Sequence, residues 1–351
     1  MRIVHCSDLH LGRRLPPLPL VDRRCLETFR HASFFALKNL VDLCLAERAS
    51  LLLIAGDLVD AWDRNHQVGL RLVGELLRLE HSRTKVFWVR GNHDAESRII
   101  GTLLLPSHVR ELGISKVESI AVEDCGVVVH GRSYPRRSTF DNLLAEYPDP
   151  IPNLLNVGIL HTSADGAALG DGYAPCGRRE LVRRGYQYFA LGHSHTPERI
   201  SERAAVVYSG CLQGRSFLES GPRGAMLITT EGSAVASIEH RALDAVRFGA
   251  LRVDVGGAET LDAVAEAVRG TVVAASGAHR PRRLVLRLIL EGLPGVSCML
   301  SVGPKRRTEA LLDASSDPDG RVWVESAWGE VHGDHPVTVR LDETWGPRVS
   351  V

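Results

Sequence analysis

Five short fragments of the chain carry side chains that hold divalent metal ions in proteins, and each fragment follows a short apolar run. Asp57, for example, comes directly after Leu51–Ala55, which reads as a strand. Carboxylate, imidazole and amide groups together suit cations such as Mn²⁺, Fe²⁺ or Zn²⁺. The candidate metal ligands, in chain order, are Asp8, His10, Asp57, Asn92, His161, His193 and His195.

The spacing of these ligands predicts a site for two cations. Asp8 and His10 are two residues apart, so in extended backbone both side chains point the same way and reach one cation. His193 and His195 repeat this spacing. Two cations about 3.5–4 Å apart need a shared anionic bridge, and Asp57 is the candidate for it. A single Asp-x-His is usually coincidence, but an ordered set of such fragments at strand ends is not.

The elements that must position these residues begin as alternating strands and helices. Hydrophobic periodicity predicts strands over 2–6, 51–55 and 85–89, and helices over 28–49 and 66–79. This order implies a parallel sheet, and such sheets bind ligands at the carboxyl ends of their strands. Beyond residue 120, short strands between Gly-rich turns predict a second sheet packed on the first, with helices outside. These strands cover 127–129, 157–160, 186–191, 205–208, 225–229 and 234–240, with one helix over 178–184.

A second unit is predicted to begin at about residue 246. It contains a predicted strand over 251–255, a helix over 259–268, and strands over 283–290 and 322–326. A chain of 351 residues favours one large domain with a smaller one. We therefore expect a catalytic domain over 1–245 and a small α+β domain over 246–351.

Composition limits the compartment and the partners. Seven scattered cysteines without a CxxC pair argue against a disulfide framework and against a thiolate zinc site. No apolar run is long enough for a membrane span, and no signal sequence precedes the first strand. These features predict a cytoplasmic protein without a membrane partner. The net charge of zero gives no support of its own for a nucleic-acid partner.

With these motifs in view, the chain resembles the calcineurin-like metallophosphoesterase superfamily. The family motifs D-x-H, G-D, G-N-H-[DE], H and G-H-x-H stand in this order across residues 8–195. The resemblance implies that one cation is held by Asp8, His10, Asp57 and His195. It implies that the other is held by Asp57, Asn92, His161 and His193.

The resemblance also implies that His93 binds no metal and instead protonates the leaving oxygen of the substrate. A catalytic histidine needs an orienting partner. Asp60, three residues after Asp57, matches the family position that supplies one, and we expect it to orient His93. Asp94 is the competing candidate, with a local structural role as the alternative.

Longer matches resemble one branch of the superfamily, the SbcD- and YhaO-type bacterial DNA repair exonucleases. They cover residues 1–12, 160–163, 172–176, 185–193 and 209–215. This branch implies a sandwich of two mixed β-sheets flanked by helices, followed by a small α+β domain that caps the active site and helps to bind DNA.

Basic residues in the chain have two alternative interpretations. The runs 280–283 and 305–307 fit contacts with DNA phosphates, or they form a solvated surface. Arg215, after the last metal motif, either clamps a substrate phosphate or pairs with a carboxylate.

The resemblance also bears on protein partners. SbcD-type chains end in helices that grip an SMC-like coiled-coil ATPase, but the tail 334–351 has prolines at 336 and 347 and no amphipathic helix pattern. A stable ATPase partner is therefore not expected, and a looser one is the alternative. Family members often form homodimers.

The leading functional hypothesis is a Mn²⁺-dependent DNA exonuclease or endonuclease of DNA repair. In it, metal-activated hydroxide attacks the phosphodiester and His93 is the general acid. The alternative is the same chemistry on a small phosphodiester or a cyclic nucleotide. A phosphoprotein substrate is disfavoured because Asp94 stands where such phosphatases carry Glu. A non-catalytic DNA-binding subunit is the third reading, and it is disfavoured because no metal ligand is missing.

Overall fold

The computed structural model describes residues 1–13, 15, 23–61, 63–164, 173–201, 204–317, 319–331 and 337–340. Gly172 and most of the tail 334–351, both used in the sequence analysis, lie outside this set. Contacts between Cα atoms group the chain into two compact units. The first comprises Met1–Arg14, His31–Gln213 and Pro222–Asp244, and the second comprises Leu15–Arg30, Gly214–Gly221 and Ala245–Val351.

The first unit contains two six-stranded mixed sheets. In one, β1 to β4 run parallel, and β11 and β12 extend the sheet beyond β1 as antiparallel strands. The order across this sheet is β12 (Ala234–Ala242), β11 (Gly224–Glu231), β1 (Arg2–Cys6), β2 (Leu51–Ala55), β3 (Lys85–Val89) and β4 (Val109–Glu111). The parallel core agrees with the predicted crossovers.

In the other sheet, β6, β7, β8 and β10 run parallel, with antiparallel β5 and β9 at its two edges. The order is β5 (Glu118–Val122), β6 (Val127–Gly131), β7 (Leu155–His161), β8 (Tyr188–Gly192), β10 (Ala205–Tyr208) and β9 (Glu198–Ser201). The central strands are buried along their whole length, as strands covered on both faces must be.

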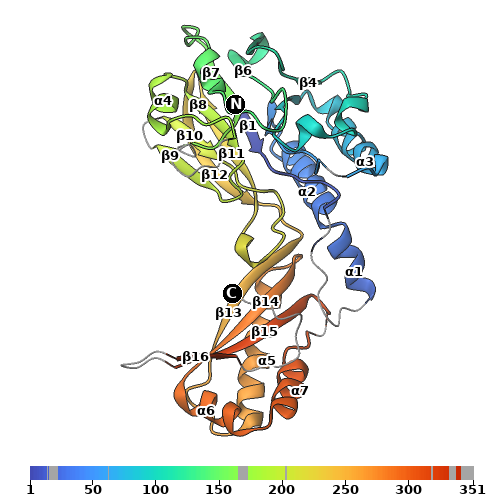
Figure 1. Ribbon diagram of the computed structural model, residues 1–351, viewed down its shortest axis with the longest axis vertical. Helices are drawn as coiled ribbons and strands as arrows, with labels where there is room; N and C mark the ends of the chain where they lie inside the picture. The colour runs from blue at the N-terminus through green and yellow to red at the C-terminus, as the bar shows by residue number, and fades with distance from the viewer. Residues whose placement is uncertain are drawn as a thin grey trace. The chain divides into compact units, whose positions relative to one another are not determined.

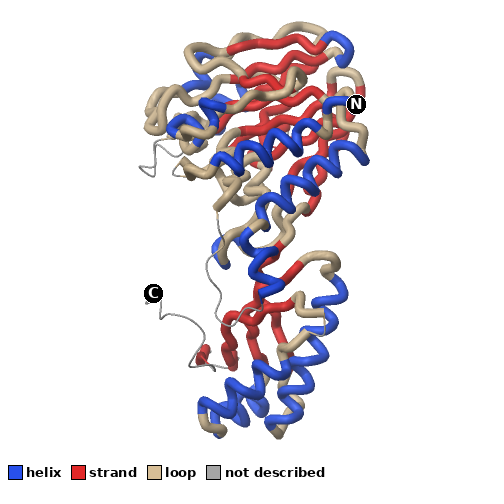
Figure 2. The backbone as a smooth tube through the Cα atoms, turned by 90° about the vertical axis from the view of Figure 1, so that its right-hand side faces the viewer, coloured by secondary structure: helices blue, strands red, loops and turns tan. Residues whose placement is uncertain are grey.

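Alternate side chains of the central strands pack into different layers, as the two-residue period of a strand requires. In β2, Leu51 and Leu53 lie in the core between the two sheets, whereas Leu52 and Ile54 pack with the helices on the outer face. Those helices are α2 (Ala32–Ala46) and α3 (His66–Leu77). Figures 1 and 2 show them lying along one side of the strands.

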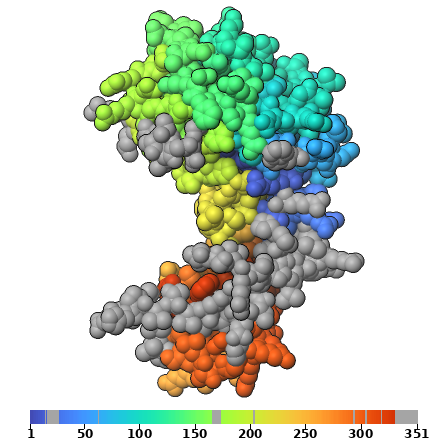
Figure 3. Space-filling view, viewed as in Figure 1, coloured from blue at the N-terminus to red at the C-terminus, as the bar shows by residue number. Residues whose placement is uncertain are grey.

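The outer face of the second sheet has its own core, built with the 3₁₀ helix η5 (Leu143–Glu146) and with α4 (Arg178–Arg183). The predicted fold class, two mixed sheets face to face with helices outside, is therefore confirmed. In the space-filling view of Figure 3, residues from the middle of the chain, coloured green, form much of the visible face of this unit.

Most predicted elements occur with shifted ends. The helix predicted over 28–49 is divided into α1 (Arg23–Arg30) and α2. Helix α3 begins where the side chain of Asn65 accepts a hydrogen bond from the backbone N–H of Gln67, which is a common N-cap. It ends at Leu77, two residues before the predicted end.

The second unit has a four-stranded sheet in the order β13 (Val246–Asp254), β14 (Arg283–Glu291), β15 (Val322–Val331) and β16 (Val337–Arg340). Strands β13 to β15 are parallel, and β16 is antiparallel. Helices α5 (Leu261–Ala278), α6 (Leu293–Ser301) and α7 (Pro304–Ala314) gather on one side of this sheet in Figures 1 and 2. Their apolar residues and those of the strands form one core.

Several arginines of the basic runs 280–283 and 305–307 form ion pairs or hydrogen bonds within this unit. Arg280 forms an ion pair with Asp319 at 2.6 Å, and Arg283 Nη1 donates to the carbonyl of Gly320. Arg307 is buried and donates to the carbonyl of Met299. Arg307 is therefore not part of a solvated surface. Within the described residues, no helix has the length and apolar character needed to cross a membrane.

Candidate metal centre

The predicted metal ligands converge at the ends of five strands from both sheets of the first unit. His161 is the last residue of β7, and each of the other ligands follows a strand. Asp8 and His10 follow β1, Asp57 follows β2, Asn92 follows β3, and His193 and His195 follow β8. Ligand atoms of Asp8, His10 and His195 lie within 4.8 Å of one another. Those of Asp8, Asp57 and His161 form a second such group.

The backbone at this cluster adopts conformations that non-glycine residues rarely take. Among the described residues, positive φ values occur at four of the predicted ligands: Asp8 (52°), His10 (41°), Asp57 (57°) and His193 (99°). Such conformations cost energy and persist where the surrounding structure imposes them, most often at functional sites. Four of the eight positive φ values found at described non-glycine residues thus fall at predicted ligands, which supports a functional site there.

The ring of His10 is oriented by a carboxylate. Its Nδ1 lies 2.7 Å from Oδ1 of Asp60, and because a carboxylate only accepts, Nδ1 carries the proton. The lone pair of Nε2 is then directed into the cluster, 3.3 Å from Nε2 of His195 and 3.8 Å from Oδ2 of Asp57. A carboxylate behind a metal-binding histidine is the usual arrangement at metal sites.

His161 is oriented in the same way by a backbone carbonyl. Its Nδ1 donates to the oxygen of Ala55 at 2.9 Å, which leaves Nε2 as an acceptor. That Nε2 lies 3.1 Å from Oδ1 of Asn92 and 3.6 Å from Oδ2 of Asp57. Three electron-rich atoms thus face one another, and a cation among them relieves their repulsion.

Asp8 has one oxygen committed to the protein and one directed into the cluster. Its Oδ2 accepts hydrogen bonds from Oγ of Ser7 at 2.6 Å and from the backbone N–H of His193 at 3.1 Å. Its Oδ1 is buried, and no donor among the described residues binds it. Nε2 of His195 lies 3.7 Å away. A buried carboxylate oxygen without a donor fits a metal ligand.

Asp57 occupies the middle of the cluster and is almost fully buried. Burial raises the pKa of this carboxyl well above its usual range, and the neighbouring charges of Asp94 and Asp8 raise it further. Burial also lowers the pKa of His161 to about 3, so this ring is neutral and able to bind a metal. A neutral His161 beside Asp57 and Asn92 thus offers nitrogen and oxygen donors that fit divalent cations.

His93 lies beside the cluster and is partly exposed. Its Nδ1 is 3.4 Å from Oδ1 of Asp60, which is a longer contact than the one between Asp60 and His10. Burial, followed by the charge of His10, lowers the pKa of His93 to about 4. Asp60 therefore faces both rings, where the sequence analysis expected it to orient His93 alone.

Asp94 has the local role that the sequence analysis gave as its alternative. Its side chain is fully buried and accepts hydrogen bonds from the backbone N–H groups of Gly91 at 3.1 Å and Val59 at 3.2 Å. It thereby ties the loop after β3 to the loop after β2. The two loops carry Asn92 and Asp57, so Asp94 fixes the relative position of two predicted ligands.

Comparison with protein families matches residues 1–197, which include every one of these ligands, to the model described as calcineurin-like phosphoesterase. The chain belongs to the calcineurin-like phosphoesterase family. Metal-dependent hydrolysis of phosphoesters is therefore the chemistry of this site. Residues 248–328 match a second model, described as the middle domain of the metallophosphoesterase YhaO.

The chain is similar to several other proteins. An uncharacterized metallophosphoesterase YhaO from Bacillus subtilis is 27% identical, and the match covers 99% of this chain and 85% of that one. The DNA double-strand break repair protein Mre11 from Methanopyrus kandleri is 27% identical over 62% of this chain and 50% of its own. A dimetal phosphatase from Danio rerio aligns with a TM-score of 0.41 and 11% identity, covering 69% of this chain and 96% of that structure.

In this calcineurin-like phosphoesterase, two glycines of the motifs are required by close packing. Gly56 has φ +89°, and a Cβ on it would lie 2.4 Å from Nδ1 of His161. A Cβ on Gly91 would lie 2.1 Å from Oδ1 of Asp57. These distances are too short for any side chain. The glycines before Asp57 and Asn92 thus allow the two loops to meet.

Sequence reasoning missed two residues of the phosphoesterase centre. Ser7 binds Oδ2 of Asp8, and its place directly before the D-x-H motif was the available signal. Tyr134 packs edge-on against the ring of His161, with ring centroids 5.5 Å apart, and is fully buried. No pattern in the sequence points to Tyr134, because it follows β6, a strand that carries no motif.

Arg215 belongs to the second unit and pairs with a carboxylate, as one of its two alternatives expected. Its Nη2 lies 2.7 Å from Oε1 of Glu219, and its Nε and backbone N–H both donate to Oε2 of the same residue. Both side chains are largely buried. The guanidinium is thus engaged within its own segment, and binding of a substrate phosphate by Arg215 stays a prediction.

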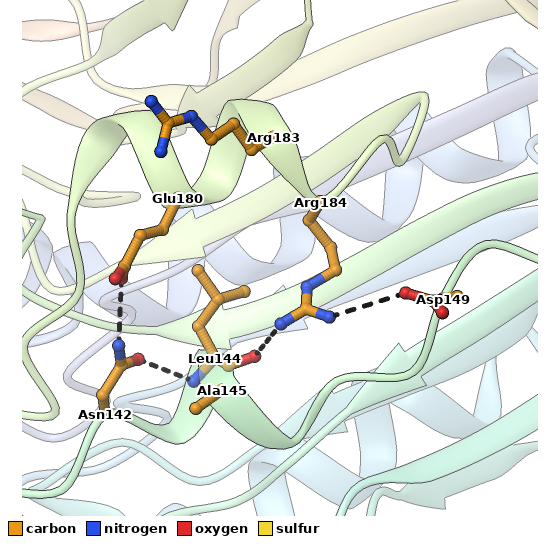
Figure 4. Close-up of a pocket in the computed structure, with 7 residues that line it drawn as sticks. All are labelled: Asn142, Leu144, Ala145, Asp149, Glu180, Arg183 and Arg184. Atoms are coloured by element: carbon orange, nitrogen blue, oxygen red, sulfur yellow. Dashed lines mark hydrogen bonds and ion pairs between the residues drawn. The ribbon is translucent and has the colours of Figure 1, made fainter.

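A surface pocket of about 370 Å³ lies between η5 and α4 of the first unit (Figure 4). Its polar groups bind one another: Asn142 Nδ2 donates to Glu180, and Arg184 donates to the carbonyl of Leu144 and lies near Asp149. None of the predicted site residues lines it. These contacts hold η5 and α4 together, and the pocket is not part of the metal centre.

Proposed function

We propose that this phosphoesterase is a Mn²⁺-dependent phosphodiesterase that cleaves DNA in DNA repair. The position of Asp57 carries the proposal. Its Oδ2 lies 3.8 Å from Nε2 of His10 and 3.6 Å from Nε2 of His161, between two sets of ligands. A carboxylate in that position suits a bridge between two cations.

The two sets share Asp57 and otherwise draw on different strands. Asp8, His10, Asp57 and His195 would hold one cation, and Asp57, Asn92, His161 and His193 would hold the other. When bound, two divalent cations activate water for attack on phosphorus and neutralise charge on the phosphoryl oxygens. The protein holds the ligand rings in the required tautomers through Asp60 and the carbonyl of Ala55.

His93 is the proposed general acid. It is more exposed than His10 and lies outside both ligand sets, so a substrate can reach it. In the protonated ring, Nδ1–H faces Asp60 and Nε2–H can be donated to the departing oxygen. Asp60 thus serves as the positioning residue for His93 while it also binds His10.

DNA is proposed as the substrate on the strength of two relationships. The Mre11 proteins that match this chain over 62% and 56% of its length are described as DNA double-strand break repair proteins. The additional unit over 248–328 resembles the middle domain of YhaO and favours a polymer over a small substrate. A non-catalytic subunit is disfavoured because every ligand position is filled.

The test is cleavage of end-labelled duplex and single-stranded DNA in Mn²⁺, with EDTA and His93→Leu as controls. The proposal predicts cleavage that disappears in EDTA and falls about 10²–10⁴-fold in His93→Leu, which still binds DNA. Cleavage of a cyclic nucleotide or small diester, with none of DNA, would instead establish the small-substrate alternative. An unchanged rate in His93→Leu would remove His93 from the role of general acid.

A further inference from the structure

Two arginines of the first unit approach the proposed general acid from different loops. Arg13 follows the His10 fragment, and its Nη1 lies 3.5 Å from Oδ1 of Asp60, the carboxylate that faces His93. Arg137 follows β6, and its Nη1 lies 3.4 Å from Oε2 of Glu96. Glu96 ends the 3₁₀ helix Asp94–Glu96, which begins directly after His93. Neither arginine was singled out by its sequence context.

The carboxylate partners of the two arginines are themselves close to His93. Asp60 Oδ1 lies 3.4 Å from Nδ1 of His93, and Glu96 is three residues further along the chain, at the end of the 3₁₀ helix that begins after His93. Arg13 and Arg137 thus approach His93 through separate partners, Asp60 and Glu96.

The ion pairs of these two arginines are loose. The side chain of Arg13 is 49% exposed and that of Arg137 is 30% exposed, and both pairs are longer than 3.3 Å. By contrast, the pair of Arg215 with Glu219 is short, largely buried and reinforced by a second hydrogen bond. Exposed, poorly aligned pairs contribute little to stability. Arg13 can therefore exchange its Asp60 partner for an incoming anion at low cost, and the pair of Arg137 with Glu96 is similarly long.

We propose that Arg13 and Arg137 bind phosphate groups of the leaving DNA strand. This inference rests on the proposed function, because His93 protonates the leaving oxygen and cations beside His93 therefore lie on the leaving side. Arginine binds phosphate oxygens through its planar fork of donors, and such contacts position a strand without reading its sequence. The site then favours substrates that carry a further phosphate beyond the leaving oxygen.

This arrangement also explains how a chain with zero net charge attracts a polyanion. The centre itself is rich in carboxylates, with Asp8, Asp57, Asp60 and Asp94 close together. Phosphates on either side of the scissile bond would be repelled unless cations lie on their path. Arg13 and Arg137 supply local positive charge, although the chain as a whole has no net charge.

The experiment compares two substrates and two kinds of readout. Arg13→Gln, Arg137→Gln and the double variant are assayed in Mn²⁺ with bis(p-nitrophenyl) phosphate, which has no further phosphate, and with a single-stranded oligonucleotide. Binding of the oligonucleotide is measured separately by fluorescence anisotropy over a series of salt concentrations, in the His93→Leu background. Arg183→Gln is the matched control, because Arg183 is an exposed arginine of the same unit on α4.

The inference predicts that the double variant lowers the ratio of kcat/KM for the oligonucleotide to kcat/KM for the small diester by about tenfold or more. Each substitution also reduces the slope of log Kd against log salt concentration by about 0.7. Arg183→Gln leaves both quantities as in the unsubstituted protein.

An unchanged ratio and salt slope in the double variant, with the unsubstituted protein cleaving DNA, would overturn the role of the arginines alone. If the unsubstituted protein hydrolyses the small diester and no oligonucleotide, the proposed function itself fails. The inference then fails with it.

Discussion

Asp60 binds His10 more closely than it binds His93: its Oδ1 lies 2.7 Å from Nδ1 of His10 and 3.4 Å from Nδ1 of His93. One carboxylate therefore faces both a predicted metal ligand and the proposed general acid. A change at Asp60 should consequently affect metal binding and turnover together, whereas a change at His93 should affect turnover alone.

Asp60→Asn is expected to weaken Mn²⁺ binding and activity by about 10–100-fold each, because the amide keeps the shape but loses the charge that orients His10. Isothermal titration with Mn²⁺ and the rate with a small diester measure the two effects. His93→Leu is the matched control and should bind Mn²⁺ as the unsubstituted protein does. Equal Mn²⁺ affinity in Asp60→Asn and the unsubstituted protein would show that Asp60 serves His93 only.

Mn²⁺ is expected to stabilise the protein against heat. At 100 times the dissociation constant it adds about 2.7 kcal/mol to the free energy of unfolding, which corresponds to roughly 5–10 °C in Tm for a unit of this size. Differential scanning fluorimetry with Mn²⁺ and with EDTA measures this shift. A Tm that does not respond to Mn²⁺ would contradict a cation site in the cluster.

Asp57→Asn is expected to act in opposite directions with and without metal. Burial and the charges of Asp94 and Asp8 disfavour the Asp57 carboxylate in the metal-free protein, so a neutral amide should raise Tm in EDTA. The same change removes the proposed bridge, so the increase in Tm caused by Mn²⁺ should shrink or disappear. A variant that loses stability in EDTA and keeps the Mn²⁺ shift would be inconsistent with this role.

His5 should make stability depend on pH. Its side chain is buried, with Nδ1 2.8 Å from the hydroxyl of Tyr188, and burial lowers its pKa to about 3. The unfolded chain protonates this histidine below about pH 6.5 and the folded chain does not, so stability falls as pH drops from 6.5 toward 3. Between pH 6.5 and 5 the loss from this group is on the order of 2 kcal/mol.

His5→Gln, which keeps a polar partner for Tyr188, should remove that part of the pH dependence. Urea unfolding gives the free energy of unfolding of each protein at pH 7 and at pH 5. The decrease between the two pH values should be smaller in His5→Gln than in the unsubstituted protein. Parallel losses in both proteins would show that His5 is protonated in the folded state.

The metal ligands could be predicted from sequence because each follows an apolar run that fixes a strand end. Parallel strands in a sandwich bring such ends together, so Asp57 and His161 meet although they are far apart in the chain. The contact of Asp60 with His10 could not be predicted, since it depends on the rotamers of two loops. The same holds for Tyr134, whose contact with His161 arises from packing.

Parts of the second unit were missed for a different reason. Residues 305–307 read as a charge run, but they lie in α7, whose helical period turns Arg307 and Leu311 to the buried side. Helix α6 begins at Leu293, between Gly292 and Pro294, and these two residues interrupt the hydrophobic pattern from which a helix is predicted. In the first unit, strand β4 has only three residues and is too short for a period to be recognised.

The number of Mn²⁺ ions bound per chain tests the central claim most directly. Purified protein is stripped with EDTA, titrated with Mn²⁺ in a calorimeter, and analysed for bound metal after desalting. The geometry around Asp57 predicts two ions per chain, falling to one or none in Asp57→Asn. A single ion in the unsubstituted protein, or two that persist in Asp57→Asn, would contradict a centre in which Asp57 bridges two cations.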